Sequence, residues 1–251
     1  MIRLSVNVNK VATLRNSRGG RVPRVLDAVA VCLGAGVQGI TVHPRADRRH
    51  VTPEDVRDIA AALEGRRPAV EYNIEGDPRP DLLELVHAVR PEQCTLVPVT
   101  PGEITSQAGW TAGAAAERLP DIIRQLHAAR IRVSLFIEPE RAAVKLAADV
   151  GADRVELYTE PFARAFEQGP EGGERSFRVY AEAADWAQAA GLGVNAGHDL
   201  DLENLVLFRR LPHLDEVSIG HAIMSRALFV GLDRVVREYL RVLNPDAMIE
   251  P

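Results

Sequence analysis

The chain has 251 residues, of which 46% are hydrophobic, as in an ordinary globular domain, and no apolar run in it is long enough to span a membrane. Its net charge of -5 at pH 7 and its pI of about 5.8 argue against a general nucleic-acid-binding protein, which usually presents a basic surface. The two cysteines have no metal-type spacing, and the first residues form a strand-like pattern rather than a secretory signal, so we expect a cytoplasmic protein with reduced thiols.

Short runs rich in β-branched residues alternate with longer amphipathic stretches. The runs predicted to be strands are residues 2–9, 39–44, 69–74, 94–99, 131–137, 154–159, 192–197 and 216–221. The stretches predicted to be helices are residues 24–36, 54–65, 81–90, 114–130, 139–152, 176–191, 202–211 and 227–243. Strict alternation indicates parallel strands with crossover helices, and this number of units favours a closed (β/α)8 TIM barrel over an open, doubly wound sheet. We predict a single α/β domain over residues 1–251.

Two connections that follow strands are long. Such connections leave the carboxyl ends of the strands, and long loops at that end of a barrel often act as lids. The first runs from residue 98 to about 113. The second runs from residue 160 to about 175 and is rich in glycine, which predicts a mobile segment or a short extra helix. A tolerated surface insertion is the alternative for the second loop.

Histidines gather where the predicted strands end. His43, His198 and His221 each end or directly follow an apolar run, and His50 comes shortly after the second run. The carboxyl ends of the strands form the catalytic face of an α/β barrel, and imidazoles titrate near neutral pH. The pattern therefore favours an enzyme that uses acid/base chemistry.

Two carboxylates are predicted at similar positions. Glu71, in AVEYNIEG, is either a partly desolvated base with a raised pKa or an ion-pair partner for arginines. Glu156, in RVELYT, is similar. Glu75 is close to Glu71 but is a second choice, because we expect it in the loop after the strand.

Several features suit phosphate. Glycine precedes His198 and His221, and barrels often bind phosphate through backbone N–H groups after strands 7 and 8. A turn glycine before a core histidine is the alternative at each place. Arginines are concentrated in TLRNSRGG and HPRADRRH, which suits small anionic ligands, although either cluster alone is also typical of a solvated surface.

Other functions remain open at this point. A metal site is disfavoured, because barrel hydrolases usually carry a His-x-His pair on one strand, and this chain has none. Lys10 can form a Schiff base with a carbonyl substrate, as in an aldolase, but a lysine at a strand end is more often a phosphate ligand. A non-catalytic sensor of phosphorylated ligands would leave the acid/base groups without a purpose.

Five motifs occur in the order and spacing of one enzyme family: LSVNVNKVATLRNSRGG, GITVHPRADRRH, VSLFIEP, VNAGHDL and IGHAI. From Leu4 to about Leu243 the chain resembles the pyridoxine 5′-phosphate synthases. The resemblance implies a barrel with extra short helices and a homo-octamer. It implies a transferase that condenses 3-amino-2-oxopropyl phosphate with 1-deoxy-D-xylulose 5-phosphate, without metal or organic cofactor. The products are pyridoxine 5′-phosphate, inorganic phosphate and water.

The resemblance also implies roles for single residues. His43, Glu71 and His198 match acid/base residues, and Glu156 matches a carboxylate that stabilises the transition state. On this basis we expect His43 and Glu71 to act as bases and His198 to donate a proton. Positions that hold the amino-ketone phosphate are matched by Asn7, Arg18, Gly220 and His221. Positions that hold the deoxyxylulose phosphate are matched by Arg45, His50 and Thr105, so the loop around Thr105 is the expected lid.

Two departures from the family pattern affect the predicted binding residues. Where many members have Asp-His after strand 1, this chain has Asn9 and Lys10. Where many have glycine after the histidine of strand 7, it has Asp199. A backbone contact can survive there, but a carboxylate near a phosphate is unfavourable unless it points away.

Overall fold

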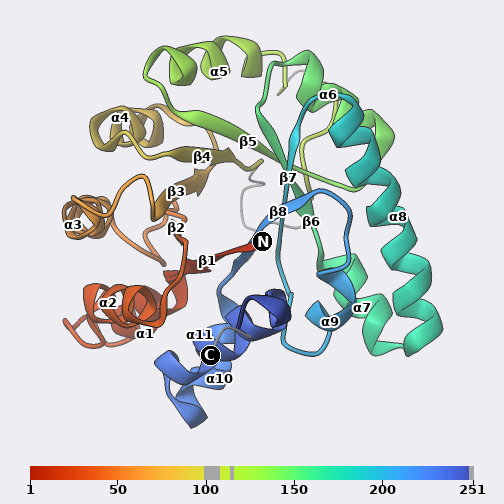
Figure 1. The fold of residues 1–251 in the computed structure, drawn as a ribbon. Helices are drawn as coiled ribbons and strands as arrows, with labels where there is room; N and C mark the ends of the chain where they lie inside the picture. The colour runs from red at the N-terminus through yellow and green to blue at the C-terminus, as the bar shows by residue number, and fades with distance from the viewer. Residues whose placement is uncertain (99–107, 114–115, 249–251) are drawn as a thin grey trace.

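A computed structural model describes residues 1–98, 108–113 and 116–248. Parallel strands close into one barrel in the order β1-β2-β3-β4-β5-β6-β7-β8, and Figure 1 looks along it from the end where the N-terminus lies. The strands are β1 (Arg3–Asn7), β2 (Gly39–Val42), β3 (Glu71–Gly76), β4 (Gln93–Leu96), β5 (Arg132–Ile137), β6 (Arg154–Tyr158), β7 (Gly193–Gly197) and β8 (Leu214–Ile219). The predicted (β/α)8 TIM barrel is confirmed.

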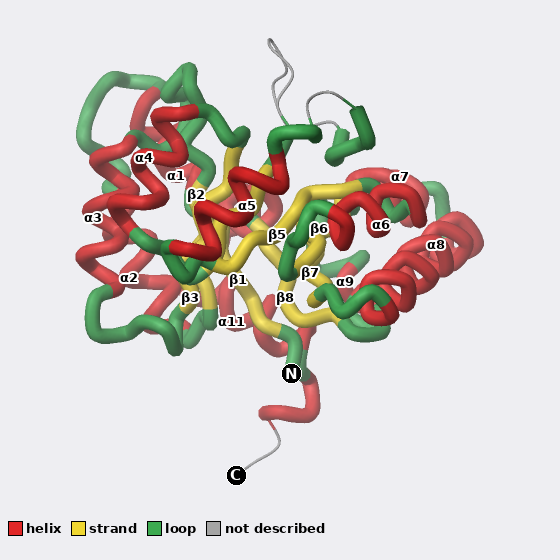
Figure 2. Tube along the Cα trace, turned by 90° about the horizontal axis from the view of Figure 1, so that it is seen from above, coloured by secondary structure: helices red, strands yellow, loops and turns green. Residues whose placement is uncertain are grey.

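Helices surround the barrel, as Figures 1 and 2 show. They are α1 (Asn9–Asn16), α2 (Val25–Ala35), α3 (Pro53–Leu63), α4 (Pro80–Val89), α5 (Leu119–Ala128), α6 (Arg141–Asp149), α7 (Glu160–Glu167), α8 (Pro170–Ala189), α9 (Leu205–Phe208), α10 (His221–Val230), α11 (Leu232–Leu243) and the 3-10 helix η1 (Pro245–Met248). The connection over residues 160–175 is the extra helix α7 and the first turns of α8, as one of the alternatives predicted. Among the described helices, none is long and apolar enough to cross a membrane.

The strands alternate in character, because each has one face toward the helices and one toward the barrel axis. Leu4 and Val6 are fully buried, and Ser5 lies between them. The hydroxyl of Ser5 is 2.7 Å from that of Thr41, and Asn73 Nδ2 donates to Thr41 Oγ1 at 3.4 Å. Hydrogen-bonded polar side chains therefore fill the middle of the barrel, while the apolar core lies between strands and helices.

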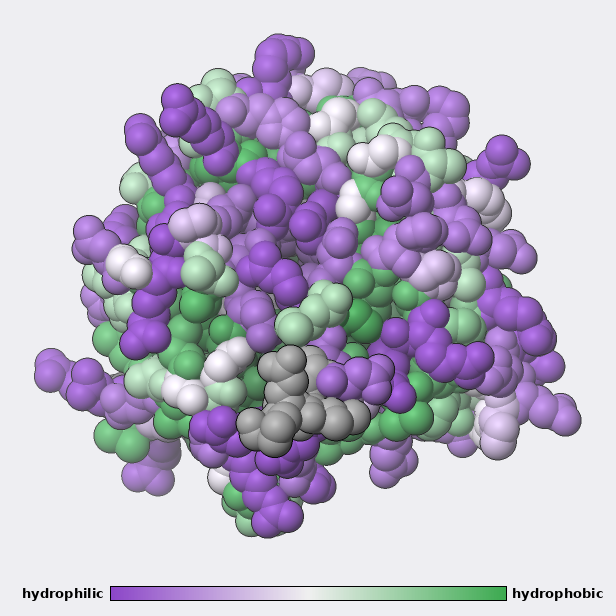
Figure 3. All heavy atoms as spheres, in the orientation of Figure 1, coloured by the Kyte–Doolittle hydropathy of each residue, from purple (hydrophilic) through white to green (hydrophobic). Residues whose placement is uncertain are grey.

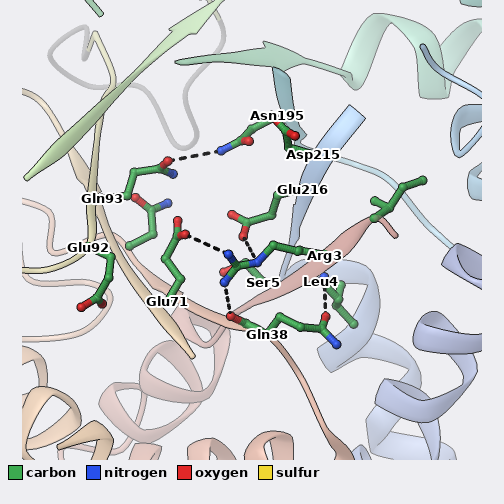
Figure 4. Close-up of polar contacts among 12 residues, drawn as sticks. Arg3, Leu4, Ser5, Gln38, Glu71, Glu92, Gln93, Asn195, Asp215 and Glu216 are labelled. Carbon is green, nitrogen blue, oxygen red and sulfur yellow. Dashed lines mark hydrogen bonds and ion pairs between the residues drawn. The ribbon is translucent and has the colours of Figure 1, made fainter. Parts of the chain in front are cut away.

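An ionic cluster closes the amino end of the barrel, and Figure 4 shows its side chains converging on the axis. Arg132 Nη2 lies 2.5 Å from Glu71 Oε1, and Arg3 Nη1 lies 3.5 Å from Glu71 Oε2. Arg3 Nε lies 3.7 Å from Glu216 Oε2. In the orientation of Figure 1, Figure 3 shows hydrophilic residues gathered over the middle of this face.

Glu71 is the first residue of β3, so the prediction that it lies at the carboxyl end of its strand is wrong. The strand begins two residues later than the apolar run suggested, because Glu71 pairs in register with Gly39, the first residue of β2. The alternative interpretation, an ion-pair partner for arginines, is the correct one.

The two ends of the barrel sequence are tied together. Asn244, directly after α11, accepts a hydrogen bond from the backbone N–H of Ile2 at 2.9 Å and donates one to its carbonyl at 2.8 Å. β8 pairs with β1 over Arg3–Val6. The end of α11 is thereby fixed next to the start of β1.

Candidate active site

A cavity of about 640 Å³ lies at the opposite end of the barrel, where the strands end. Its polar lining comes from the ends of β1, β2, β3, β6, β7 and β8 and the segments that follow them: Asn7, Asn9, Lys10, His43, Arg45, His50, Glu75, Glu156, Tyr158, Glu160, Arg164, His198, Asp199, Ser218, Gly220 and His221. A cavity with many titratable groups at this end of a barrel is the expected place for catalysis.

His43 and Glu75 form the first acid/base pair. His43 follows the last residue of β2 and Glu75 is the fifth residue of β3, with His43 Nδ1 3.8 Å from Glu75 Oε2. Asn7 and Ser218 donate to the two oxygens of Glu75, each at 3.4 Å. The backbone N–H of His43 donates to Asn9 Oδ1 at 2.9 Å. Asn9 therefore fixes the start of the segment that carries His43.

Burial changes the protonation of this pair in opposite senses. Burial, followed by the nearby positive charges, lowers the pKa of His43 to about 3, so the imidazole is neutral at pH 7. Burial and the negative charge of Glu156 raise the pKa of Glu75 well above its usual value. His43 can therefore accept a proton and Glu75 can donate one.

The low pKa of His43 predicts that the free energy of unfolding depends on pH. A folded-state pKa below the unfolded value gives stability that is present above about pH 6.5 and is lost as the pH falls toward 3. Between pH 7 and pH 5 this amounts to about 2 kcal/mol. We expect urea unfolding to show a loss of about that size in the wild type, and His43→Gln to lack that part of it. Equal losses in both proteins would contradict the pKa assigned to His43.

Two positively charged side chains, Lys10 and Arg45, line the cavity near His43, together with His50. Burial, followed by the charges of Lys10 and Arg45, lowers the pKa of His50 to about 4. The rings of His43 and His50 meet edge to face with centroids 6.3 Å apart. Asn16 of α1 donates to the backbone carbonyl of His50 at 2.8 Å and so holds this segment over the cavity. The positive charges around His50 suit a phosphate.

Arg15 does not line the cavity with Lys10 and Arg45. Its guanidinium donates to both oxygens of Asp55, at 2.5 and 2.8 Å. Asp55 also completes a capping box with Thr52 at the start of α3. Arg15 therefore ties α1 to α3 and supports the segment that carries Arg45 and His50.

The opposite wall carries Glu156 and His198. Burial raises the pKa of Glu156 to about 7, partly offset by a hydrogen bond from Thr95 and by the charge of His198. His198 directly follows β7, and its ring meets that of Tyr158 edge to face at 5.0 Å. The hydroxyl of Tyr158 donates to Glu160 at 3.0 Å. A carboxylate that titrates near neutral pH and an imidazole thus face the first pair across the cavity.

Glycine at position 197 leaves room for the carboxylate of Glu156. A Cβ there would lie 2.5 Å from Glu156 Oε1 and 3.1 Å from the carbonyl oxygen of Ser218. Gly197→Ala is expected to displace that carboxylate and to lower kcat about 100-fold, the size of effect that follows from misplacing a catalytic group by about 1 Å. Gly34→Ala, where a Cβ meets nothing within 4 Å, is the matched control and should leave kcat unchanged. Full activity in Gly197→Ala would show that Glu156 can move without consequence.

The remaining predicted residues fall in three groups. Asn7, Asn9, Lys10, Arg45, His50, Asp199, Gly220 and His221 line the cavity as expected. Glu71 does not, because it lies in the ionic cluster at the amino end, and Glu75 stands where Glu71 was expected. Arg18 is exposed in the turn after α1 and does not line the cavity, and Thr105 lies outside the described residues.

Tyr158 and Ser218 line the cavity but are not among the predicted site residues, and Glu75 is predicted only as a second choice. Tyr158 and Ser218 looked like ordinary strand residues, since an aromatic ring and a hydroxyl are common in strands. The period of two in β3 was the available signal for Glu75. Alternate residues of a strand share one face, so Asn73 and Glu75 lie on the same face as Glu71. Of these three residues, Glu75 lies nearest the carboxyl end of β3.

The sequence model of the family described as the pyridoxal phosphate biosynthesis protein PdxJ matches residues 4–245. The chain belongs to this family. A protein named pyridoxine 5′-phosphate synthase from Bacteroides thetaiotaomicron is 48% identical over 97% of this chain and 100% of its own length. One of the same name from Leptospira biflexa is 47% identical, covering 97% of this chain and 98% of that protein. The predicted family is confirmed, and with it a role in vitamin B6 biosynthesis.

Solved structures with similar folds include phosphoribosyl anthranilate isomerase from Thermotoga maritima, with a TM-score of 0.61 and 14% identity over 98% of this chain and 100% of that one. A thiamine phosphate pyrophosphorylase from Pyrococcus furiosus gives a TM-score of 0.61 and 12% identity over 97% and 96%. At these identities the similarity concerns the barrel fold alone.

Proposed function

We propose that the protein is a pyridoxine 5′-phosphate synthase, a transferase that condenses 3-amino-2-oxopropyl phosphate with 1-deoxy-D-xylulose 5-phosphate. The observation that carries the proposal is the composition of the cavity. It holds two histidine–carboxylate sets, His43 with Glu75 and His198 with Glu156, next to a wall that carries Lys10 and Arg45. The whole sequence forms one barrel domain, and it works in the cytoplasm.

The reaction requires several proton transfers in one place. The amine attacks the ketone, and the carbinolamine loses water to give an imine. The imine loses a proton to become an enamine, phosphate leaves, and the ring closes with loss of water. His43 is the base, because its imidazole lines the cavity and is neutral at pH 7. Glu75 delivers a proton first and accepts one afterwards, and His198 donates in the elimination and ring-closing steps.

Two phosphorylated substrates require two separate anion sites. Lys10 and Arg45 give one wall its positive charge and His50 adds a neutral imidazole, which together suit the phosphate of the sugar. Gly220 and His221 stand at the first turn of α10, whose backbone N–H groups suit the phosphate of the amino ketone. A Cβ at position 220 would lie 2.9 Å from the carbonyl oxygen of Asn7, so this turn is packed tightly against β1.

The proposal also includes the oligomeric state of the enzyme and its independence of cofactors. The chain works as a homo-octamer, and Arg18 and Thr105 contribute to binding substrate phosphate. The acid/base groups of the cavity can carry every proton transfer above, so the reaction needs no metal and no organic cofactor.

A turnover assay tests the function. Purified protein treated with EDTA is mixed with both substrates, and pyridoxine 5′-phosphate is followed by fluorescence together with released phosphate. Equal amounts of the two products are the expected result. Phosphate without the pyridine product would mean that elimination occurs and ring closure does not. Binding of both substrates without turnover would favour the phosphate-ligand sensor.

Lys10 lines the cavity, so the alternative function, a Schiff-base aldolase, needs a separate test. Borohydride reduction in the presence of the sugar phosphate would trap a Schiff base on Lys10. We expect no adduct, and a stoichiometric adduct would replace the synthase mechanism with a covalent one.

A further inference from the structure

The turn that carries His198 has an unusual backbone. His198 and Asp199 are consecutive non-glycine residues with positive φ, 88° and 58°. Such residues are uncommon, and the surroundings must hold them in place. The hydroxyl of Thr159, which is fully buried, donates to the carbonyl of His198. Asn204, 3% exposed, donates to the carbonyl of Asp199 at 3.0 Å. The turn is therefore fixed from both sides.

The same turn brings a carboxylate to one nitrogen of the imidazole. Asp199 Oδ2 lies 3.1 Å from His198 Nδ1. The hydrogen bond with His198 is the main cause that lowers the pKa of Asp199, so this group is ionised at neutral pH. An ionised carboxylate can only accept a hydrogen bond, so Nδ1 must carry the proton. Tyr158 packs against the ring at an interplanar angle of 80°.

We propose that Asp199 is a positioning residue that holds His198 in the Nδ1-protonated tautomer and leaves Nε2 as the nitrogen that exchanges protons with substrate. The proposal rests on the proposed function in that it gives His198 a proton-transfer role. It goes beyond it, because Asp199 is predicted as a substrate-binding position and not as a partner of His198. The side chain at this position instead sets the chemistry of its neighbour.

The tautomer is measured directly, without substrate. Protein labelled with 15N-histidine is examined by NMR at pH 8.5, and the His198 signals are assigned by their loss in His198→Gln. The wild type should show the Nδ1-protonated ring. In Asp199→Asn the side-chain amide can donate to Nδ1, so the ring should shift toward the Nε2-protonated form. A wild-type ring protonated at Nε2, or ring shifts unchanged in Asp199→Asn, would overturn the proposal.

Kinetics and stability separate positioning from a structural role. Asp199→Asn should lower kcat about 100-fold and change KM by less than about threefold, since the ring exposes the wrong nitrogen. Asp199→Gly removes the carboxylate but suits positive φ, so kcat should fall while Tm stays or rises. Full kcat in Asp199→Gly would contradict the proposal.

Asp185→Asn is the matched control, because Asp185 pairs with His213 at 3.3 Å on the outer surface. It should leave kcat unchanged. If the wild type forms no pyridoxine 5′-phosphate, the proposed function fails, and the NMR result still decides the tautomer.

Discussion

Glu75→Gln is expected to lower kcat by a factor of about 10² to 10⁴, the contribution of a positioned acid/base group. Glutamine keeps the shape of the side chain, and its amide oxygen can still accept from Asn7 while its amide nitrogen donates to the Ser218 hydroxyl, but it cannot exchange a proton. The effect should appear in kcat, with little change in KM. Steady-state kinetics with both substrates measure it.

Glu71→Gln is the matched comparison, because it makes the same chemical change on the same strand at the other end of the barrel. It should keep kcat within about threefold of the wild type, since Glu71 does not line the cavity. It should lower the free energy of unfolding by about 1 to 3 kcal/mol, because Arg3 and Arg132 lose a charged partner. A Glu71→Gln enzyme that is stable but inactive would reverse the assignment of the two glutamates.

Arg132→Met is expected to destabilise the protein by about 3 kcal/mol, the lower end of the range for breaking a buried ion pair. The side chain of Glu71 is only 3% exposed, so its charge would lose its nearest partner in a site that water hardly reaches. Arg3 remains 3.5 Å away and limits the loss. For a domain of this size the melting temperature should fall by roughly 6 to 12 °C.

A double-mutant cycle checks the cause. Arg132→Met combined with Glu71→Met removes both charges and should recover much of the stability, because apolar side chains often replace a buried ion pair without loss. Catalytic constants should stay near the wild-type values in both proteins. Additive losses would mean that the two residues act independently.

The barrel was predictable because its signals are local. The repeated change from β-branched runs to amphipathic stretches, and the glycines before His198 and His221, are features of short segments. The choice between Glu71 and Glu75 was not local. It depends on where β3 begins, which is set by its register with β2. A shift of two residues moves Glu71 from the middle of the expected run to the amino end of the strand and brings Glu75 from the loop into the strand.

The role of Asp199 was also beyond sequence analysis. A carboxylate next to a predicted phosphate site looked unfavourable, and only the positive φ of both residues turns it toward the imidazole. That backbone is held by Thr159, which lies 39 residues before His198, and by Asn204, which lies beyond the motif, five residues after Asp199. Contacts with residues outside the motif leave no pattern in the motif itself.

Pairing of the first strand with the last has a consequence for synthesis of the chain. β1 cannot pair with β8, nor Ile2 with Asn244, until almost the whole polypeptide has left the ribosome. At typical elongation rates the edge of β1 waits roughly 10 to 40 s, during which it can pair with other nascent chains. Substitutions in β8 should therefore reduce the yield of folded protein during translation more than they reduce the stability of molecules that have already closed.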